Sequence, residues 1–408
     1  MKHLKGILAI SLSSLMMACS SNDEPPVNTE SRAMMTLDVQ EQAKVQSINH
    51  FGITMLQSLA ANPENDGNVL FSPVSAAVFT GMLANGGDAS VQQAVAKAFG
   101  MPGESIDGLN KVMGRLLKEV PQTDSKNKLA FANGMWFSSD RTVKESYRKA
   151  MNDVFDAEIS SVAASVDYVS LINKWCADKT GGLIKDVSRP EMLLPVTANA
   201  TVFKGEWNEP FDTKNTGKRK FTNADGAAVD VDMMSGEQRM QVMTTEYGTF
   251  VQMPYYLESY IAVIMLPNEN TTLGEAVAAI TERDIDKAVS WNGGNKGYIT
   301  MPCVDIPHQR ISLEEALESA GLDGLFDSDK MTGITEETFG MNAVEQHSTL
   351  TIDEKGTKST SVTVGMLLGS SSPGSAAPVV ITVDRPYLFM VVHTDSKAII
   401  TSAMIRQL

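Results

Sequence analysis

The sequence has few cysteines and no concentrated basic charge. Its 408 residues include 3 Cys, 34 Lys plus Arg and 49 Asp plus Glu, which gives a formal net charge of −15. Nucleic-acid-binding proteins gather Lys and Arg to displace counterions from phosphates, and no cluster of five basic residues occurs here. Three cysteines are also too few for a disulfide framework. The composition therefore excludes a nucleic-acid partner and a disulfide-stapled scaffold.

The short signatures of common enzymes are absent as well. No Gly-x-Ser-x-Gly, His-Glu-x-x-His, phosphate-binding glycine loop or Cys-x-x-Cys pair occurs, and the five histidines share no ligand spacing. Asp353 and Glu354 could form an acid/base pair, but neighbours on a strand point to opposite faces. We therefore predict no metal, no cofactor and no enzymatic activity. A hydrolase whose triad is assembled from distant positions is the remotest alternative.

The first residues are typical of an export signal. Lys2 and Lys5 precede an apolar run from Gly6 to Ala18, which is shorter than the roughly 20 residues of a membrane-spanning helix. The run ends in Leu-Met-Met-Ala-Cys, which resembles a bacterial lipobox with Met16 at the usual leucine position. We predict a lipoprotein signal at 1–18 and lipidation of Cys19. An ordinary secretory signal is the alternative.

A polar, acidic stretch follows Cys19 and is predicted to be a lipidated tether over residues 19–42. Its Asp23-Glu24 pair resembles the surface-export signal of Bacteroidota lipoproteins. We therefore expect a protein anchored in the bacterial outer membrane and exposed on the cell surface, with a periplasmic or secreted protein as the alternative. Cys176 and Cys303 have no disulfide spacing and are predicted to be free thiols, although pairing in an oxidising compartment is the other possibility.

Hydrophobic periodicity predicts an α+β protein. Apolar residues recur at helical spacing from Val45 to Ala61, and further helices are predicted at 76–83, 91–99, 108–119, 146–154 and 169–179. Runs of β-branched and aromatic residues predict strands at 129–137, 197–203, 249–254, 260–266, 387–393 and 398–405. Because the strands come late and are mostly not separated by helices, we expect a large mixed or antiparallel sheet and not repeated βαβ units.

The segment from Gly356 to Thr363 has an unusual composition for a loop. It contains three Thr and one Val, which prefer strands, and there is little turn chemistry until Gly369. In a strand, one face would carry only the small residues Thr357, Ser359, Ser361, Thr363 and Gly365. We interpret the segment as a strand-forming stretch held outside a sheet, able to slide over a packed interior.

Six stretches, in this order, are similar to signatures of the serpin family. They are Asn68–Ser75, Ala132–Phe137, Ile172–Trp175, Asn199–Trp207, Asp353–Thr357 and Asp384–Phe389. The resemblance runs from about residue 45 to the C-terminus and implies one serpin domain at 43–408. The implied fold has a large mixed central sheet, further sheets, about eight or nine helices and an exposed reactive-centre loop.

The resemblance implies a protease inhibitor that acts as a suicide substrate. A target protease of the serine, or else cysteine, type cleaves the loop at about 357–378. It is then held as an acyl-enzyme while the loop inserts into the central sheet, a mechanism described for serpins in general. We expect a monomer whose partners are this protease and the lipid membrane. The main alternative is a non-inhibitory, serpin-fold surface binding protein that is cleaved as an ordinary substrate.

The family motifs also imply roles for particular residues. The hinge of the loop is expected at Glu354, Gly356, Thr357, Ser359, Ser361 and Thr363, and the regions where the sheet opens, the shutter and the breach, at Ser72, Ser75, Asn199, Trp207, Gln346 and Cys303. Among the shutter and breach residues, two depart from the family pattern. Cys303 follows Pro302 where a basic partner of Glu354 is usual, so we expect Glu354 to lack an ionic partner. Gln346 takes the place of a histidine, with His347 beside it, so we do not expect the pH switching associated with that histidine.

Counting from Glu354 at the family's usual spacing places the reactive bond between Ser370 and Ser371. The loop is slightly long, so cleavage after Leu367, Leu368 or Gly369 is the alternative. No Lys, Arg, Phe, Tyr or Trp occurs from Ser359 to Asp384, which leaves trypsin-like proteases without a suitable side chain. We therefore predict elastase-like, subtilisin-like or chymotrypsin-like targets.

Overall fold

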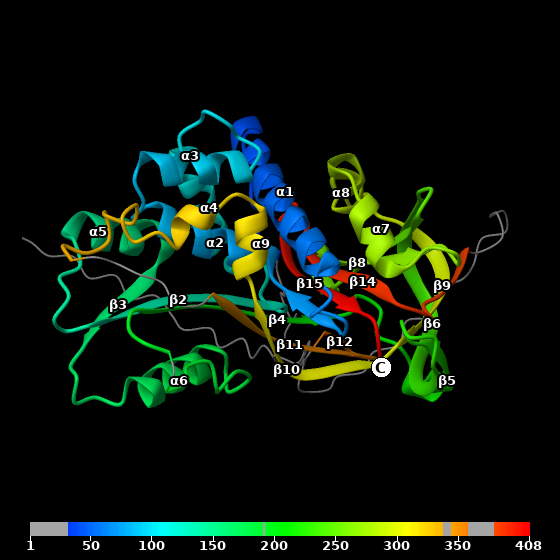
Figure 1. The fold of residues 1–408 in the computed structure, drawn as a ribbon. Helices are drawn as coiled ribbons and strands as arrows, with labels where there is room; N and C mark the ends of the chain where they lie inside the picture. Colours follow the sequence, from blue (N-terminus) through cyan, green and yellow to red (C-terminus); the bar gives the residue numbers. More distant parts are fainter. Residues whose placement is uncertain (1–31, 191, 338–343, 358–378) are drawn as a thin grey trace, which may run out of the picture. The chain divides into compact units, whose positions relative to one another are not determined.

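The computed structural model describes residues 32–190, 192–337, 344–357 and 379–408 (Figure 1). They belong to one compact unit that runs from Ser31 to Leu408. The described helices are α1 (Val39–Ala61), α2 (Pro73–Ala84), α3 (Ala89–Ala98), α4 (Asp107–Glu119), α5 (Glu145–Phe155), α6 (Tyr168–Lys179), α7 (Leu273–Ala279), α8 (Glu282–Ala288) and α9 (Glu314–Ser319).

The strands form two mixed sheets. They are β1 (Val69–Phe71), β2 (Lys128–Ser138), β3 (Ala157–Val162), β4 (Val196–Glu206), β5 (Gly217–Thr222), β6 (Ala228–Thr244), β7 (Gly248–Pro254), β8 (Tyr260–Pro267), β9 (Asn295–Pro302), β10 (Val304–Ser312), β11 (Glu345–Asp353), β12 (Gly356–Thr357), β13 (Val379–Thr382), β14 (Tyr387–His393) and β15 (Ile399–Ile405). The nine-stranded sheet has the order β1-β15-β14-β8-β7-β6-β9-β13, with β5 paired to β6. The six-stranded sheet has the order β10-β11-β12-β4-β2-β3.

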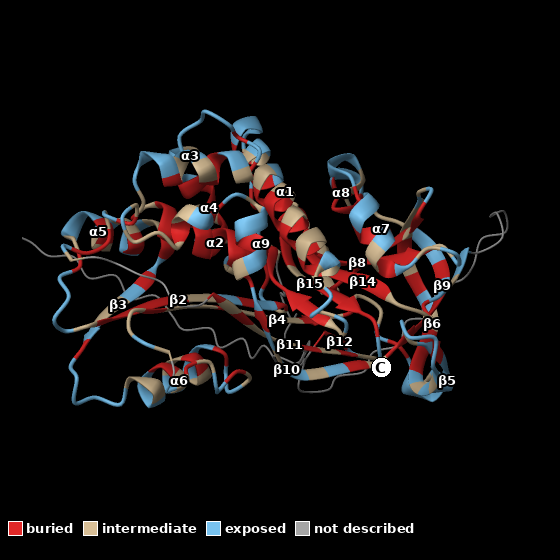
Figure 2. Ribbon diagram, viewed as in Figure 1, coloured by how far each residue is buried: buried red, intermediate tan, exposed pale blue. Residues whose placement is uncertain are grey.

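Helix α2 lies between the two sheets and is buried at every position (Figure 2). It begins at Pro73 because the Ser72 side chain caps the first turn by accepting from Ser75 N, and proline suits the first helical position. Helix α1 starts at a capping box between Asp38 and Glu41 and buries one apolar face that includes Phe51. The main core joins these helices to both sheets.

Helix α6 covers the opposite face of the six-stranded sheet. It packs with β2 and β4 in a separate small core that contains Trp136, Ile172 and Cys176. Around β2 and β4, the six-stranded sheet is therefore covered on one side by α2 and on the other by α6 and the connector at 180–190 and 192–195. Figure 1 shows α2 and α6 on opposite sides of β2 and β4.

The predicted elements are confirmed, and the predicted α+β fold with a mixed sheet is correct. All six predicted helices and all six predicted strands are present with small shifts at their ends. Helices α7 to α9 were not predicted because they have only 7, 7 and 6 residues, which is less than the periodic pattern needs. Within the described ranges, no helix is both long and apolar enough to cross a membrane, and no cluster of His, Cys, Asp and Glu could hold a metal ion.

Candidate functional site

The predicted hinge is already partly inserted into the six-stranded sheet. Gly356 and Thr357 form β12, which pairs with Asp353 and Ile352 of β11 on one side and with β4 on the other. Thr357 is buried, with 4% of its surface exposed, so the exposed loop does not begin at Thr357 as predicted.

Position 356 requires glycine, because the backbone of β4 leaves no room for a side chain there. A Cβ atom there would lie 2.0 Å from the carbonyl oxygen of Gly205 on β4, and the residue also has a φ of +154°. The Thr357 hydroxyl hydrogen-bonds the hydroxyl of Tyr255 at 2.6 Å. Burial raises the pKa of Tyr255 well above its usual range, so its hydroxyl stays protonated and available to this bond.

Trp207 holds the strand that leads into the hinge. Its Nε1 donates to Asp353 O at 2.9 Å and its backbone N donates to Lys355 O at 2.8 Å. The indole stacks on Tyr255 with ring centroids 4.8 Å apart and planes at 11°. Trp207 is buried, with 1% of its surface exposed, and Tyr255 is its stacking partner. Its assignment to the breach stays a prediction.

Glu354 has a neutral partner where the family pattern has a basic one. Thr216 Oγ1 donates to Glu354 Oε1 at 2.7 Å, which satisfies one carboxylate oxygen without an opposite charge.

Cys303 is a half-buried free thiol, and Cys176 is a buried one. Burial raises the pKa of Cys303 to about 11, with a further contribution from the charges of Glu354, Asp232 and Asp353. Cys303 is therefore a neutral thiol at neutral pH.

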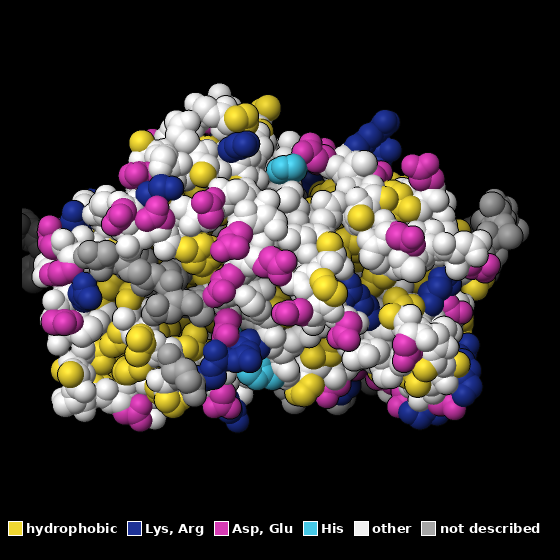
Figure 3. Space-filling view, in the orientation of Figure 1, with side chains coloured by type: hydrophobic (Ala, Val, Ile, Leu, Met, Phe, Trp, Pro, Cys, Tyr) yellow, Lys and Arg dark blue, Asp and Glu magenta, His cyan; other side chains and the backbone are white. Residues whose placement is uncertain are grey.

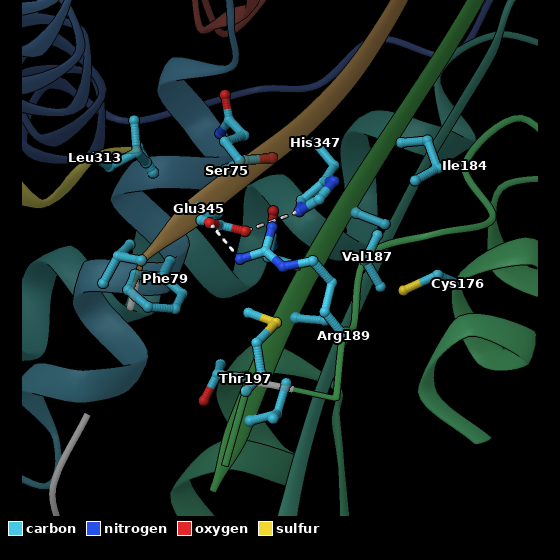
Figure 4. A pocket seen from close by; sticks show the side chains of 18 of the residues that line it. Ser75, Phe79, Cys176, Ile184, Val187, Arg189, Thr197, Leu313, Glu345 and His347 are labelled. Carbon is cyan, nitrogen blue, oxygen red and sulfur yellow. Dashed lines mark hydrogen bonds and ion pairs between the residues drawn. The ribbon is translucent and has the colours of Figure 1, made fainter. Parts of the chain in front are cut away.

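Below β12, the two flanking strands are separated by an open slot. No backbone hydrogen bond between described residues joins β4 directly to β11. A cavity of about 190 Å³ lies between them, lined by Ser75 and Phe79 of α2 on one side and by Ile184, Val187 and Arg189 of the connector on the other (Figure 4). Because it touches groups on both faces, this cavity passes through the sheet. We call this gap between β4 and β11 the strand slot.

Two serines at the start of α2 hold the two edges of the strand slot. Ser72 N donates to Gln346 Oε1 at 2.6 Å, and Gln346 Nε2 donates to Ser72 O at 3.2 Å, which ties β11 to α2. On the other edge, the hydroxyl of Ser75 hydrogen-bonds that of Thr201 on β4. Ser72 Oγ in turn donates to Ile400 O at 2.6 Å. The shutter residues therefore form one polar cluster that bridges both edges.

Asn199 lies on the β4 edge with an unsatisfied acceptor. Its Nδ2 donates to Asn133 Oδ1 on β2, and Asn133 donates to Phe155 O at 2.7 Å. The Oδ1 atom of Asn199 is buried and has no hydrogen-bond partner among the described residues. A buried acceptor without a hydrogen bond destabilises the folded protein. Insertion of a group that donates to Asn199 Oδ1 would therefore be favourable.

The rest of the predicted site lies outside the described residues. This holds for the hinge residues Ser359, Ser361 and Thr363, for the reactive bond Ser370–Ser371, for its alternatives Leu367, Leu368 and Gly369, and for the signal and Cys19. The predictions for these residues stay predictions.

The sequence signature of serpins, described as serine protease inhibitors, matches residues 46–407. The chain belongs to the serpin family. This serpin is 30% identical over 385 residues to iripin-2 of Ixodes ricinus, covering 90% of this chain and 95% of the relative. It is 27% identical over 376 residues to human glia-derived nexin, covering 87% and 91%. The native structure of the thermophilic serpin tengpin matches with a TM-score of 0.78 and 25% identity, covering 92% of this chain and 96% of tengpin.

This membership makes the chain a serpin-family protease inhibitor and not an enzyme. Target proteases of the serine class are the partners of such inhibitors. Three residues important to the site were not predicted from the sequence: Tyr255, Thr201 and Thr216. No pattern marks them, because their partners are distant in sequence; Tyr255, for example, is 102 residues from Thr357.

Proposed function

We propose that this serpin inactivates its target by inserting the cleaved loop between β4 and β11. The observation that carries the proposal is β12, which already occupies the top of the strand slot. Continuing its register downward would place Thr363 opposite Gln346 and Asn199. There its hydroxyl could serve the unsatisfied Asn199 Oδ1. The small residues Ser359, Ser361 and Thr363 would then face α2, as Thr357 does.

The free energy released by this insertion is large enough to deform a bound protease. About a dozen new ladder hydrogen bonds, at roughly 0.5 to 1.5 kcal/mol each, would release on the order of 10 kcal/mol before side-chain burial is counted. The uncleaved form is then metastable, because the strand position between β4 and β11 stays empty although the loop could fill it and lower the free energy. Release of this energy can deform a protease that is tethered to the loop.

The composition of the loop directs the choice of target. We infer elastase-like, subtilisin-like or chymotrypsin-like proteases, because from Ser359 onward the loop offers small and aliphatic side chains and no basic one. The test mixes the mature protein with an elastase-like and a trypsin-like protease. We expect an SDS-stable complex with the first, and a complex with trypsin alone would refute the assignment. Cleavage of the loop with neither a complex nor a gain in heat stability would identify a non-inhibitory binding protein.

The position of the reactive bond has its own test. The mass of the released C-terminal peptide should show that it starts at Ser371, and a start at Leu368, Gly369 or Ser370 would move the bond. The variant Ser370→Arg should gain complex formation with a trypsin-like protease. Leu367→Arg is the matched control, because cleavage three residues earlier shortens the inserted strand by about 10 Å at 3.3 Å per residue. We expect that control to be cleaved mainly as a substrate.

We further propose that the protein is a lipoprotein of the bacterial outer membrane, displayed on the cell surface. The support is the lipobox-like segment that ends in Cys19 and the Asp23-Glu24 pair behind it. Cys19→Ser should abolish labelling with a fatty-acid analogue and release the protein from the membrane fraction. External protease should digest the wild-type protein on intact cells. Protection of the protein until the cells are broken would place it in the periplasm.

A further inference from the structure

The lower end of the strand slot is bridged by an ion pair. Arg189, in the connector between α6 and β4, places its Nη2 3.0 Å from Glu345 Oε1. Glu345 is the first residue of β11, and its side chain is only 14% exposed. Figure 4 shows the guanidinium reaching across the gap toward β11, with the dashed line marking the pair. The bridge therefore joins the β4 side of the slot to the β11 side.

The alternation of β11 places this bridge on the outer face of the sheet. Gln346 is buried and bonds α2 on the inner face, so Glu345 and His347 point to the opposite face, beneath the connector. A strand that continues the register of β12 between β4 and β11 passes Gln346 first and then reaches Glu345, the first residue of β11, with Val364. Its outward side chains would meet the Arg189–Glu345 bridge at that level.

The other charged groups around Glu345 do not span the slot. Arg310 lies 3.8 Å from Glu345, but it belongs to β10, which is paired with β11 and moves with it. His347 lies 3.5 Å from the second carboxylate oxygen and stacks on His308. The pKa of His347 is lowered, first by burial and then by His308, so its ring is neutral at pH 7. Arg189 is thus the permanent positive charge that connects Glu345 to the other side of the slot.

We propose that Arg189 and Glu345 form a clasp that slows complete insertion of the loop and so keeps the inhibitor in its active, uncleaved state. This inference rests on the proposed insertion mechanism. The clasp stabilises the uncleaved form and is lost when a strand fills the lower slot. Removing it lowers the barrier to insertion by the free energy of the pair. For a partly buried pair this corresponds to roughly a two- to fivefold change in rate.

The test measures how fast the uncleaved protein loses its ability to form complexes at raised temperature while it remains folded. Arg189→Gln and Glu345→Gln should each accelerate this loss roughly two- to fivefold, and the double variant should be no faster than either single variant. Arg310→Gln is the matched control, because it removes a cation from the same carboxylate on the same side of the slot. Its rate should equal that of the wild type.

Several outcomes would overturn the clasp. An unchanged rate in Arg189→Gln, additive effects in the double variant, or equal acceleration by Arg310→Gln would each do so. If Arg189→Gln does not fold, Glu345→Gln tests the other half of the pair independently. Failure of the proposed function looks different: wild-type protein would then gain no heat stability after loop cleavage, and both inferences would fall together.

Discussion

At the scale of single residues, the hinge depends on one absent side chain and one hydroxyl pair. Gly356 lets β12 approach β4 to a distance that a Cβ atom would prevent, and Thr357 is fixed by its bond to Tyr255. The hinge therefore rests in the sheet before any protease arrives. Insertion can start from this position without first opening the top of the strand slot.

Gly356→Ala should displace β12 from the sheet. The added methyl would clash with Gly205 O, so we expect the free energy of unfolding to fall by about 1 to 3 kcal/mol. Thermal or denaturant unfolding measures this loss, and slower complex formation should accompany it. Gly217→Ala on strand β5 is the matched control, because nothing lies within 4 Å of its Cβ position. Equal effects of the two substitutions would contradict the fit described for Gly356.

His393 is a buried neutral imidazole far from the strand slot. Its Nδ1 accepts from Ser396 N at 3.3 Å and bonds Ser396 Oγ at 2.8 Å, and its Nε2 lies 3.1 Å from Thr123 Oγ1. The Thr123 hydroxyl itself donates to Val120 O at 2.7 Å. This network assigns the proton to Nε2, because Nδ1 is occupied as an acceptor. Protonation of Nδ1 would break the bond from the Ser396 backbone.

The stability of the protein should therefore fall in acid. Burial lowers the pKa of His393 to about 4 from an unperturbed value near 6.5. The unfolded chain takes up a proton below pH 6.5 that the native ring refuses. The free energy of unfolding then decreases by roughly 3 kcal/mol between pH 6.5 and pH 4 from this group alone. Denaturant unfolding of His393→Gln across this range should show a shallower slope than the wild type, and an identical slope would contradict the assignment.

At the scale of elements, the start of α2 contacts both strands that border the strand slot. Ser72 holds β11 through Gln346, and Ser75 holds β4 through Thr201. The two contacts come from the N-cap residue and the third residue of a single capped turn. Movement of either strand relative to α2 must break one of them, so the start of α2 determines how easily the slot widens.

A double-mutant cycle on Ser75→Ala and Thr201→Val tests the β4 contact. Each single substitution should lower the free energy of unfolding by about 1 kcal/mol, and the double variant should lose less than the sum. The measurement is denaturant unfolding of the uncleaved protein. Ser75 also lies at the N-terminus of α2, so its backbone bond to Ser72 Oγ serves as an internal reference that both alanine and serine retain. Strict additivity of the two losses would show that the hydroxyl pair does not couple them.

Sequence reasoning identified the elements of this fold better than their contacts. The long periodic helix α1 and the apolar strands β8 and β14 were predictable because their patterns are local. The hinge and shutter positions followed from family resemblance alone. Partial insertion of β12, the Tyr255–Thr357 bond and the Arg189–Glu345 pair were not predictable, because each joins residues more than a hundred positions apart. The β12 case also depends on a steric fit at Gly356 that no periodicity encodes.

At the scale of the whole molecule, the surface carries a mixed but mainly acidic charge. Figure 3 shows acidic side chains spread over the visible face with basic ones among them and no continuous basic stripe. This distribution agrees with the net charge of −15. The main core, by contrast, packs residues of both sheets together.

Loop cleavage should raise the heat stability of the whole molecule. Filling the strand slot adds ladder bonds to both β4 and β11 and gives Asn199 Oδ1 a donor, for a gain on the order of 10 kcal/mol. For a chain of this size, that gain corresponds to an increase of roughly 20 °C or more in the unfolding midpoint. Scanning calorimetry before and after cleavage by an elastase-like protease measures the shift. Protein incubated with the same protease after active-site blocking is the control, and it should keep the lower midpoint. An unchanged midpoint in the cleaved sample would mean that the slot stays unfilled, and the protein would then be a substrate and not an inhibitor.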